Sequence, residues 1–139
     1  MSSKFLLVRE VLAESVRTGR PEIAVRDDVE AAFGSVEAFL MALHHRWRTA
    51  LLARLDALLE DSPADFDAAV VAAWTDPKIG GRGLRALLDA HADNPVLAAA
   101  QERERLLLRR SVGVEVPPPG SRPRAVAHST ARCWWRGAA

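Results

Sequence analysis

The apolar positions of residues 35–61 recur at steps of three and four, the spacing that returns to one side of an α-helix. They are Val36, Leu40, Leu43, Trp47, Leu51, Leu55 and Leu58. Met41, Leu52 and Leu59 widen this stripe to roughly half of the helix circumference, more than the ~100° arc of an ordinary surface helix. At about 1.5 Å per residue the helix is about 40 Å long. The pattern predicts the central helix of a bundle, covered by neighbours on two sides.

Weaker periodic segments on both sides of this stretch predict the helices that cover it. Residues 4–17 repeat apolar side chains at steps of three and four, and Gly19–Pro21 ends that helix. After the central helix, Phe66, Val70 and Trp74 share one face at steps of four. Both segments are amphipathic, so each is expected to bury one side against the central helix.

Capping residues mark where several of these helices begin. Asp27, with Glu30 three residues later, has the pattern of a capping box and opens a short helix that ends at Gly34. Ser35 is the predicted N-cap of the long helix. In Ser62–Asp65 the serine can cap, the proline suits the first helical position, and the aspartate favours the positive end of the next helix.

The second half of the chain continues the helical pattern. Residues 76–83 begin with a break at Asp-Pro and form a glycine-rich loop, and residues 84–91 are a short amphipathic helix. Asn94 precedes a proline and opens a last helix over residues 95–111. Polar residues 101–105 interrupt its apolar face, so we expect it on the outside of the bundle. The sequence predicts an all-α fold, a small antiparallel helical bundle of about five helices around the long one.

The character of the chain changes after Ser111. Residues 112–116 alternate and fit a single strand, which is not stable without a partner. Pro117–Pro119 forms a stiff spacer, and the remainder lacks periodicity. We predict a helical bundle domain over residues 1–111 and a Pro-rich, basic, flexible tail over residues 112–139.

Composition indicates a bacterial, cytoplasmic protein. The chain of 139 residues has one cysteine, Cys133, which excludes an internal disulfide framework. Arginine, alanine and leucine dominate while tyrosine is absent, a bias typical of a GC-rich genome. No apolar run approaches the ~20 residues of a membrane span. Arg9 and Glu10 interrupt the apolar patch near the start, so we expect neither membrane insertion nor secretion.

Charge is unevenly distributed, and the basic tail is a candidate for binding. Residues 1–111 carry 15 basic and 17 acidic side chains, whereas residues 112–139 carry four arginines against Glu115 alone. Arginine neutralises phosphate and tryptophan stacks on bases, but both are also favoured anchors of protein interfaces. A third interpretation is an unselected segment of GC-rich composition. The candidate residues are Arg122, Arg124, Arg132, Trp134, Trp135 and Arg136.

A histidine in the central helix is the first candidate for chemistry within the bundle. On a helical wheel His44 falls inside the apolar arc, and Glu37 and Arg48 lie close to the same line. A half-desolvated imidazole between an acid and a base can titrate near neutrality, and with Trp47 these residues form a possible polar pocket for a small molecule. The alternative is a structural histidine that is hydrogen-bonded to a neighbouring helix.

The glycine-rich loop is the second candidate. Glycines let backbone N–H groups approach an anion, and here a helix N-terminus follows between flanking cations. The anion-binding residues are predicted to be Lys78, Gly80, Gly81, Arg82 and Arg85. Neither a Walker A loop nor a dinucleotide fingerprint is present. The alternative is that the glycines supply only the turn between two helices.

Catalysis and metal binding find little support in the sequence. The helical metal motifs Glu-x-x-His and His-Glu-x-x-His do not occur, and neither does the Gly-x-Ser-x-Gly nucleophile elbow. Asp89 and Asp93 share a helix face, but His91 points to the opposite side. We therefore predict no catalytic residue, no metal site and no cofactor, and we expect the protein not to be an enzyme.

The leading functional hypothesis is a non-catalytic protein-interaction or regulatory helical module of a bacterial cytoplasmic protein. The wide apolar face of the central helix also fits self-association as a homodimer. The alternative hypothesis is a nucleic-acid-associated protein that binds through the basic Arg/Trp tail and the Arg82/Arg85 region. Salt separates the two hypotheses, because phosphate binding weakens steeply as salt rises and an apolar protein interface does not.

Overall fold

The computed structural model describes residues 3–21 and 26–119, and in this part of the chain it shows helices and no strand. The all-α prediction is confirmed. None of the helices in these ranges is long and apolar enough to cross a membrane. In chain order the helices are α1 (Ser3–Thr18), α2 (Asp27–Phe33), α3 (Val36–Asp61), α4 (Phe66–Thr75), α5 (Leu84–Ala90) and α6 (Pro95–Val112).

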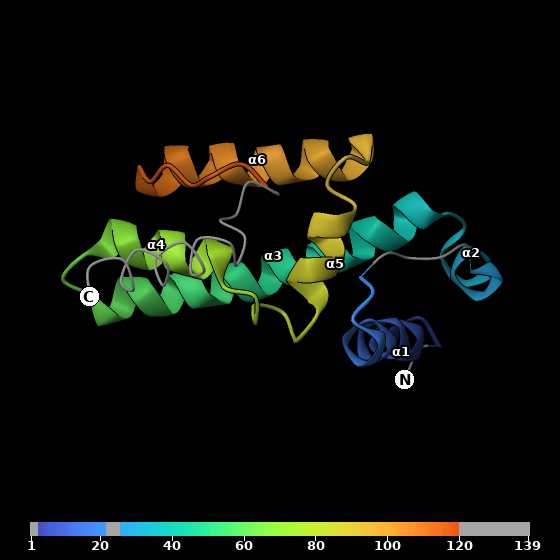
Figure 1. Ribbon diagram of the computed structural model, residues 1–139. Coiled ribbons are helices and arrows are strands. Elements are labelled where there is room, and N and C mark those ends of the chain that lie inside the picture. The colour runs from blue at the N-terminus through green and yellow to red at the C-terminus, as the bar shows by residue number, and fades with distance from the viewer. Residues whose placement is uncertain (1–2, 22–25, 120–139) are drawn as a thin grey trace, which may run out of the picture.

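The long helix α3 is the centre of the bundle, as its apolar stripe predicts. It contacts α2, α4, α5 and α6, and in Figure 1 α6 runs along one side of it while α4 runs along its C-terminal half. The Trp47 side chain is fully buried, and its ring meets the edge of Trp74 on α4 with centroids 5.1 Å apart. The stripe is therefore covered within one chain, although Leu59 at its end stays 56% exposed.

Helix α1 is attached differently. It packs mainly on α2 and α5, and not along α3. Leu7, Val11 and Leu12 are its buried residues, whereas Phe5 and Leu6 near its start remain exposed. Figure 1 shows α1 and α2 grouped near the N-terminal part of α3, with α6 on the other side. A space bordered by α1 and α3 results, and it is described below.

Two predicted helix starts are correct and two are wrong. Ser35 accepts a hydrogen bond from the Ala38 backbone N–H at 3.0 Å, and Asn94 accepts from both Val96 and Leu97. For α2, however, Arg26 and not Asp27 occupies the N-cap position, and no side chain caps the helix. The Arg26 side chain explains the shift, because it binds Asp28 at 2.7 Å and also reaches carboxylates on α1.

For α4 the capping residue is Asp65 and not Ser62. The Asp65 carboxylate accepts a hydrogen bond from the Ala68 N–H at 3.0 Å. Ser62 instead ends α3 in the left-handed conformation, with φ 47° and its backbone N–H bound to the Leu58 carbonyl. The two residues between them form the connection, so a serine that closes one helix is not available to open the next.

The last helix, α6, is more firmly packed than its interrupted apolar pattern predicts. It contacts α3 along its length and buries Leu97, Ala100, Gln101 and Leu108. Of the polar residues 101–105 that interrupt the apolar pattern, Arg103 is exposed on the outer side of the helix, whereas Gln101 is buried against α3. A polar residue inside an apolar stripe is therefore part of the helix interface, and its partner is described below.

The segment after α6 continues the core. No strand forms at the predicted position within the described residues; instead Val112 ends α6, and Val114 and Val116 are buried. The indole N–H of Trp74 donates a hydrogen bond to the Pro117 carbonyl at 3.0 Å. The first residues of the predicted tail thus pack on the bundle, while the division at residue 111 itself stays a prediction.

Candidate functional site

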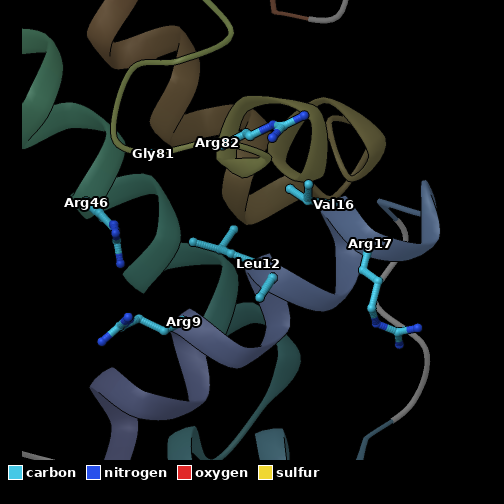
Figure 2. A pocket seen from close by; sticks show the side chains of 8 residues that line it. Arg9, Leu12, Val16, Arg17, Arg46, Gly81 and Arg82 are labelled. Atoms are coloured by element: carbon cyan, nitrogen blue, oxygen red, sulfur yellow. The ribbon is translucent and has the colours of Figure 1, made fainter.

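A groove between α1 and α3 gathers basic side chains around an apolar floor. It has a volume of about 430 Å³ and is bordered by α1, by Arg46 of α3 and by the loop before α5. Figure 2 shows Arg9 and Arg46 on one side of Leu12, and Arg82 and Arg17 on the other side near Val16. We call this feature the arginine groove. Its lining residues are Arg9, Leu12, Ala13, Val16, Arg17, Arg46, Gly81 and Arg82.

The sequence of α1 explains how basic and apolar residues come to share this face. Positions 9, 13 and 17 differ by four and positions 9, 12 and 16 by three or four, so all lie on one side of a helix. Leu12 is buried and forms the base of the groove, while Val16 is 37% exposed. The arginine stems and the aliphatic floor together form a surface that is apolar in its depth and positive at its rim.

The glycine-rich loop forms the third wall, because its glycines permit close approach to two helices. A Cβ on Gly80 would lie 3.3 Å from the Trp47 Cα, and one on Gly83 would lie 2.7 Å from a methyl group of Val16. Gly80, Gly81 and Gly83 all have positive φ, which disfavours other residues. The Arg46 Nε donates to the Gly80 carbonyl at 3.0 Å, which fixes the loop against α3.

The charges at the groove are not neutralised within the described residues. Five arginines elsewhere in the described chain form ion pairs with carboxylates, namely Arg26, Arg48, Arg85, Arg105 and Arg109. None of the four arginines of the groove forms such a pair with a described residue. Single exposed arginines without ion pairs among the described residues also occur, such as Arg54, whereas four arginines line this one hollow. Clustered like charges favour the binding of an anion.

The predicted anion site of the loop is only partly assembled. Gly81 and Arg82 line the groove, whereas Lys78 is exposed at the start of the loop. The Gly81 N–H already donates to the Lys78 carbonyl at 3.1 Å, so this donor belongs to the turn. The alternative interpretation, glycines that build the connection, is therefore well supported by the geometry, and a phosphate site in the loop stays a prediction.

Arg85, the fifth residue of that predicted site, lies in the interior. It is 2% exposed, forms an ion pair with Asp89 at 2.7 Å, and stacks its guanidinium 4.8 Å from the centre of the Trp47 ring. Arg82 and Arg85 thus do not share one surface. Arg85 is the second residue of α5 and is buried together with Leu84, Leu87 and Leu88. Its side chain therefore lies on the inner side of this helix.

His44 takes part in a buried polar network between α3 and α6. Its Nδ1 lies 2.9 Å from the amide nitrogen of Gln101, and its Nε2 lies 3.8 Å from the Glu104 carboxylate. Glu104 in turn forms an ion pair with Arg48, whose Nε lies 2.6 Å from the carboxylate. Glu37 is exposed and belongs to none of these contacts. The structure therefore brings His44, Arg48 and Trp47 close together but leaves Glu37 outside the predicted pocket.

Burial makes this histidine a neutral hydrogen-bonding residue. The pKa of His44 is lowered to about 4, chiefly because burial disfavours the charged imidazolium, and the neighbouring positive charges of Arg85 and Arg48 act in the same direction. The Glu104 carboxylate lies 3.8 Å from the His44 Nε2 and is paired with Arg48. An imidazole that stays neutral at pH 7 and joins two helices matches the structural alternative from the sequence. A role in small-molecule binding stays a prediction.

Sequence reasoning missed three of the four groove arginines and the partner of His44. Arg9, Arg17 and Arg46 are ordinary surface arginines in the sequence, and only the steps of four on α1 indicate a shared face. Their common groove depends on how α1 is placed against α3, which no local pattern predicts. In the sequence Gln101 belongs to the predicted polar interruption of residues 101–105, although its spacing of four from Leu97 places it on the buried side of α6.

Other predicted sites receive less information from the structure. Within the described residues no group of three or more His, Cys, Asp or Glu side chains could hold a metal ion. The tail residues Arg122, Arg124, Arg132, Trp134, Trp135 and Arg136 lie outside the described residues. Comparison with protein-family models, with curated proteins and with solved structures finds no match to this chain.

Proposed function

We propose that the protein is a non-catalytic interaction module that binds an acidic segment of another protein in the arginine groove. The observation that supports this most directly is that four arginines, without carboxylate partners in the described chain, line one hollow with an apolar floor. Bidentate pairing with carboxylates is the interaction that guanidinium groups make best. Arginine is also a preferred residue at protein interfaces.

The chemistry of the lining residues favours binding over catalysis. They are arginines, aliphatic residues and a glycine. An arginine remains protonated near neutral pH, so it does not act as a general base, and none of the other lining residues is a nucleophile. The groove can hold and orient a negatively charged group, but its described lining does not supply a proton-transfer step.

An acidic protein segment fits the groove better than a nucleic acid does. The floor is aliphatic, formed by Leu12, Ala13 and Val16, and offers no aromatic ring on which a base could stack. Glu10 and Glu14 are exposed on the same helix and bind Arg26, which interrupts any continuous basic track for a phosphate backbone. A segment with both carboxylates and apolar side chains matches the positive rim and the apolar floor.

Self-association is a weaker form of the interaction hypothesis. The wide apolar stripe of α3, which suggested a homodimer, is largely covered by α4, α5 and α6. The exposed Leu59 alone is too small a surface for a stable dimer interface, which buries about 800 Å² per partner. We keep a bacterial cytoplasmic setting as part of the proposal, supported by the residue bias and the lone cysteine.

Selection from a random peptide library displayed on phage tests the proposal. The peptides should have about 16 residues, long enough to follow α1 as a helix. We expect the full-length protein to enrich sequences that combine Asp or Glu with Leu, Ile or Phe. The enriched peptides, synthesised with a fluorophore, are then titrated by fluorescence anisotropy. Enrichment of basic or uncharged sequences contradicts the proposal.

Charge reversal at the groove identifies the binding surface. The double variant Arg9→Glu/Arg82→Glu should weaken binding of the selected acidic peptides at least about tenfold. Arg54→Glu is the matched control, because Arg54 is exposed on α3 and forms no ion pair among the described residues, and it should bind like the wild type. Equal binding by the double variant shows that the groove is not the site.

The nucleic-acid alternative keeps one supporting observation, the exposed Arg82 at the groove. A labelled single-stranded oligonucleotide is titrated in parallel with the peptides at low and at physiological salt. Under our proposal it binds more weakly than the acidic peptide and the difference grows with salt. An oligonucleotide that binds more tightly than every selected peptide, and loses binding in Arg9→Glu/Arg82→Glu, supports the alternative instead.

A further inference from the structure

A second hollow lies beside the arginine groove and shares a wall with it. It has a volume of about 340 Å³ and lies among α1, α2 and α3. Its lining is mostly apolar, with two cations, and Arg46 borders both hollows. We call it the Phe5 hollow. Its lining residues are Lys4, Phe5, Val8, Phe33, Ala42 and Arg46.

Phe5 is the exposed apolar residue of this hollow, whereas Val8, Phe33 and Ala42 are half-buried. Phe5 is 44% exposed, and its neighbour Leu6 on α1 is 52% exposed. Leu6 is the next residue on the helix and does not line the hollow, so Phe5 is the accessible large apolar side chain at this site. The cations stand beside rings: the Lys4 ammonium is 5.5 Å from the centre of Phe33, and the Arg9 guanidinium is 6.0 Å from that of Phe5.

We infer that the Phe5 hollow receives a large apolar side chain of the same acidic segment that occupies the arginine groove. This inference rests on the proposed function and specifies the partner further. Three observations support one continuous site: Arg46 is common to both hollows, Arg9 lies over Phe5, and α1 is a wall of each. Protein interfaces commonly have a buried apolar core that is surrounded by a polar or charged rim.

The cations at the hollow select against other apolar occupants. Lys4 and Arg46 keep the rim positive, so an anchor side chain flanked by carboxylates is favoured over one flanked by lysines or arginines. Charge complementarity thus extends along the whole site. The occupant is an acidic amphipathic segment, and the anchor adds specificity that the arginines alone cannot give.

The geometry of α1 sets the spacing in the partner. The Phe5 hollow uses positions 4, 5 and 8 of α1, and the arginine groove uses positions 9, 12, 13, 16 and 17. The middles of these sets are about seven residues apart, which is about 10 Å along the helix axis. A partner helix lying beside α1 therefore presents its anchor about two turns from its carboxylates, on the same face.

A designed helical peptide tests this spacing against the full-length protein by fluorescence anisotropy. It carries one Phe and a Glu pair about seven residues away on the same face, and it is made in both chain directions. We expect at least one direction to bind. Replacing its Phe by Ala, or moving the Phe by two positions to the opposite face, should weaken binding at least about tenfold.

A variant that fills the hollow tests the same inference from the protein side. Ala42 lines the hollow from α3, so Ala42→Phe should block the anchor and weaken binding of the designed peptide at least about tenfold. Ala53→Phe, at an exposed position farther along α3, is the matched control and should not change binding. Circular dichroism and the melting temperature of both variants confirm that the fold is kept.

The outcomes separate this inference from the proposed function. If Phe→Ala in the peptide and Ala42→Phe in the protein both leave binding unchanged while Arg9→Glu/Arg82→Glu abolishes it, the anchor is wrong and the acidic interaction stands. If the charge reversal also has no effect, the proposed function is wrong. Loss of binding in all three cases, with Ala53→Phe unaffected, supports the continuous site.

Discussion

His44 shows how one polar side chain is accommodated in the centre of this bundle. It is 4% exposed, and the groups that face it come from three helices: Gln101 and Glu104 on α6, Arg48 on α3 and Arg85 on α5. A neutral imidazole accepts a hydrogen bond from the Gln101 amide nitrogen without adding a buried charge. Protonation would add a third positive charge beside Arg48 and Arg85, which is why burial and charge act on the pKa in the same direction.

A pH titration of stability tests this state of His44. Its pKa is about 4 in the folded protein against an ordinary 6.5, so the unfolded chain binds more protons between these values. The contribution of His44 to the free energy of unfolding is therefore complete above about pH 6.5 and is lost as the pH falls toward about 4. We expect this loss to reach about 2–3 kcal/mol.

The variant His44→Gln isolates this effect from the other titrating groups. Glutamine can still form a hydrogen bond with Gln101 but does not titrate. Urea denaturation of both proteins at a series of pH values should show a stability difference that narrows as the pH falls from about 6.5 to about 4. A difference that stays constant over this range means that His44 titrates normally in the folded state.

At the scale of single helices, the caps separate what local sequence can predict from what it cannot. Ser35 was predicted correctly because it directly precedes the long apolar stripe of α3, and Asn94 because a proline follows it at the first helical position. Between α3 and α4, however, Ser62 and Asp65 compete for one helix start, and both are common N-caps. Asp65 caps α4 because α3 extends through Asp61 and takes Ser62 as its own end.

Alanine substitutions at these two positions give a direct comparison. Asp65→Ala should lower the free energy of unfolding by about 1 kcal/mol, because the Ala68 N–H loses its acceptor. Ser62→Ala should cost less, because the Ser62 hydroxyl makes only a long bond of 3.4 Å to the Leu59 carbonyl. Thermal denaturation of both variants measures the order, and a larger cost for Ser62→Ala contradicts the assigned cap.

The loop between α4 and α5 depends on glycine for packing as well as for turning. Gly83 has φ 87°, and a Cβ there would lie 2.7 Å from a Val16 methyl group and 3.5 Å from the Leu12 carbonyl oxygen. Gly83→Ala should therefore destabilise the protein by about 1–3 kcal/mol through backbone strain and steric conflict. In the double variant Val16→Ala/Gly83→Ala the conflicting methyl groups are absent, so the steric part of the lost free energy of unfolding should be recovered. A double-mutant cycle by urea denaturation measures this coupling between Val16 and Gly83.

An additive double variant means that α1 and the loop are not in contact at this point. That result bears on the groove as well, because the contact between Gly83 and Val16 places Arg82 beside α1. If Gly83→Ala destabilises the protein without coupling to Val16, the glycine is required only by the turn. The loop then does not form the third wall of the arginine groove.

For the whole molecule, the apolar periodicity of the chain predicts the all-α fold but does not predict the arginine groove. The steps of three and four in α3 predicted its position at the centre, since a wide apolar stripe must be covered. Arg9 and Arg46 carry no comparable signal, because an exposed arginine on a helix is ordinary. They become a candidate site only through the placement of α1, which packs on α2 and α5 and leaves a groove beside α3.

Truncation tests where the bundle ends. Val114 and Val116 are buried, and the Trp74 indole donates to the Pro117 carbonyl, so residues after the predicted boundary belong to the packed core. A chain that ends at Gly113 should be less stable than one that ends at Pro119 by about 2–5 kcal/mol, because two valines lose their burial and a buried donor loses its acceptor. Urea denaturation of the two truncated proteins measures the difference.

This pair is chosen so that the comparison depends only on residues 114–119, which the structure describes. Near-UV circular dichroism adds a second measurement, because Trp74 packs on Trp47 and loses its hydrogen bond only in the shorter chain. Equal stability and equal spectra place the end of the core at residue 111, as the sequence predicts. A less stable shorter chain with an altered tryptophan signal moves the boundary of the bundle past Pro117 and makes the segment after α6 a structural part of the domain.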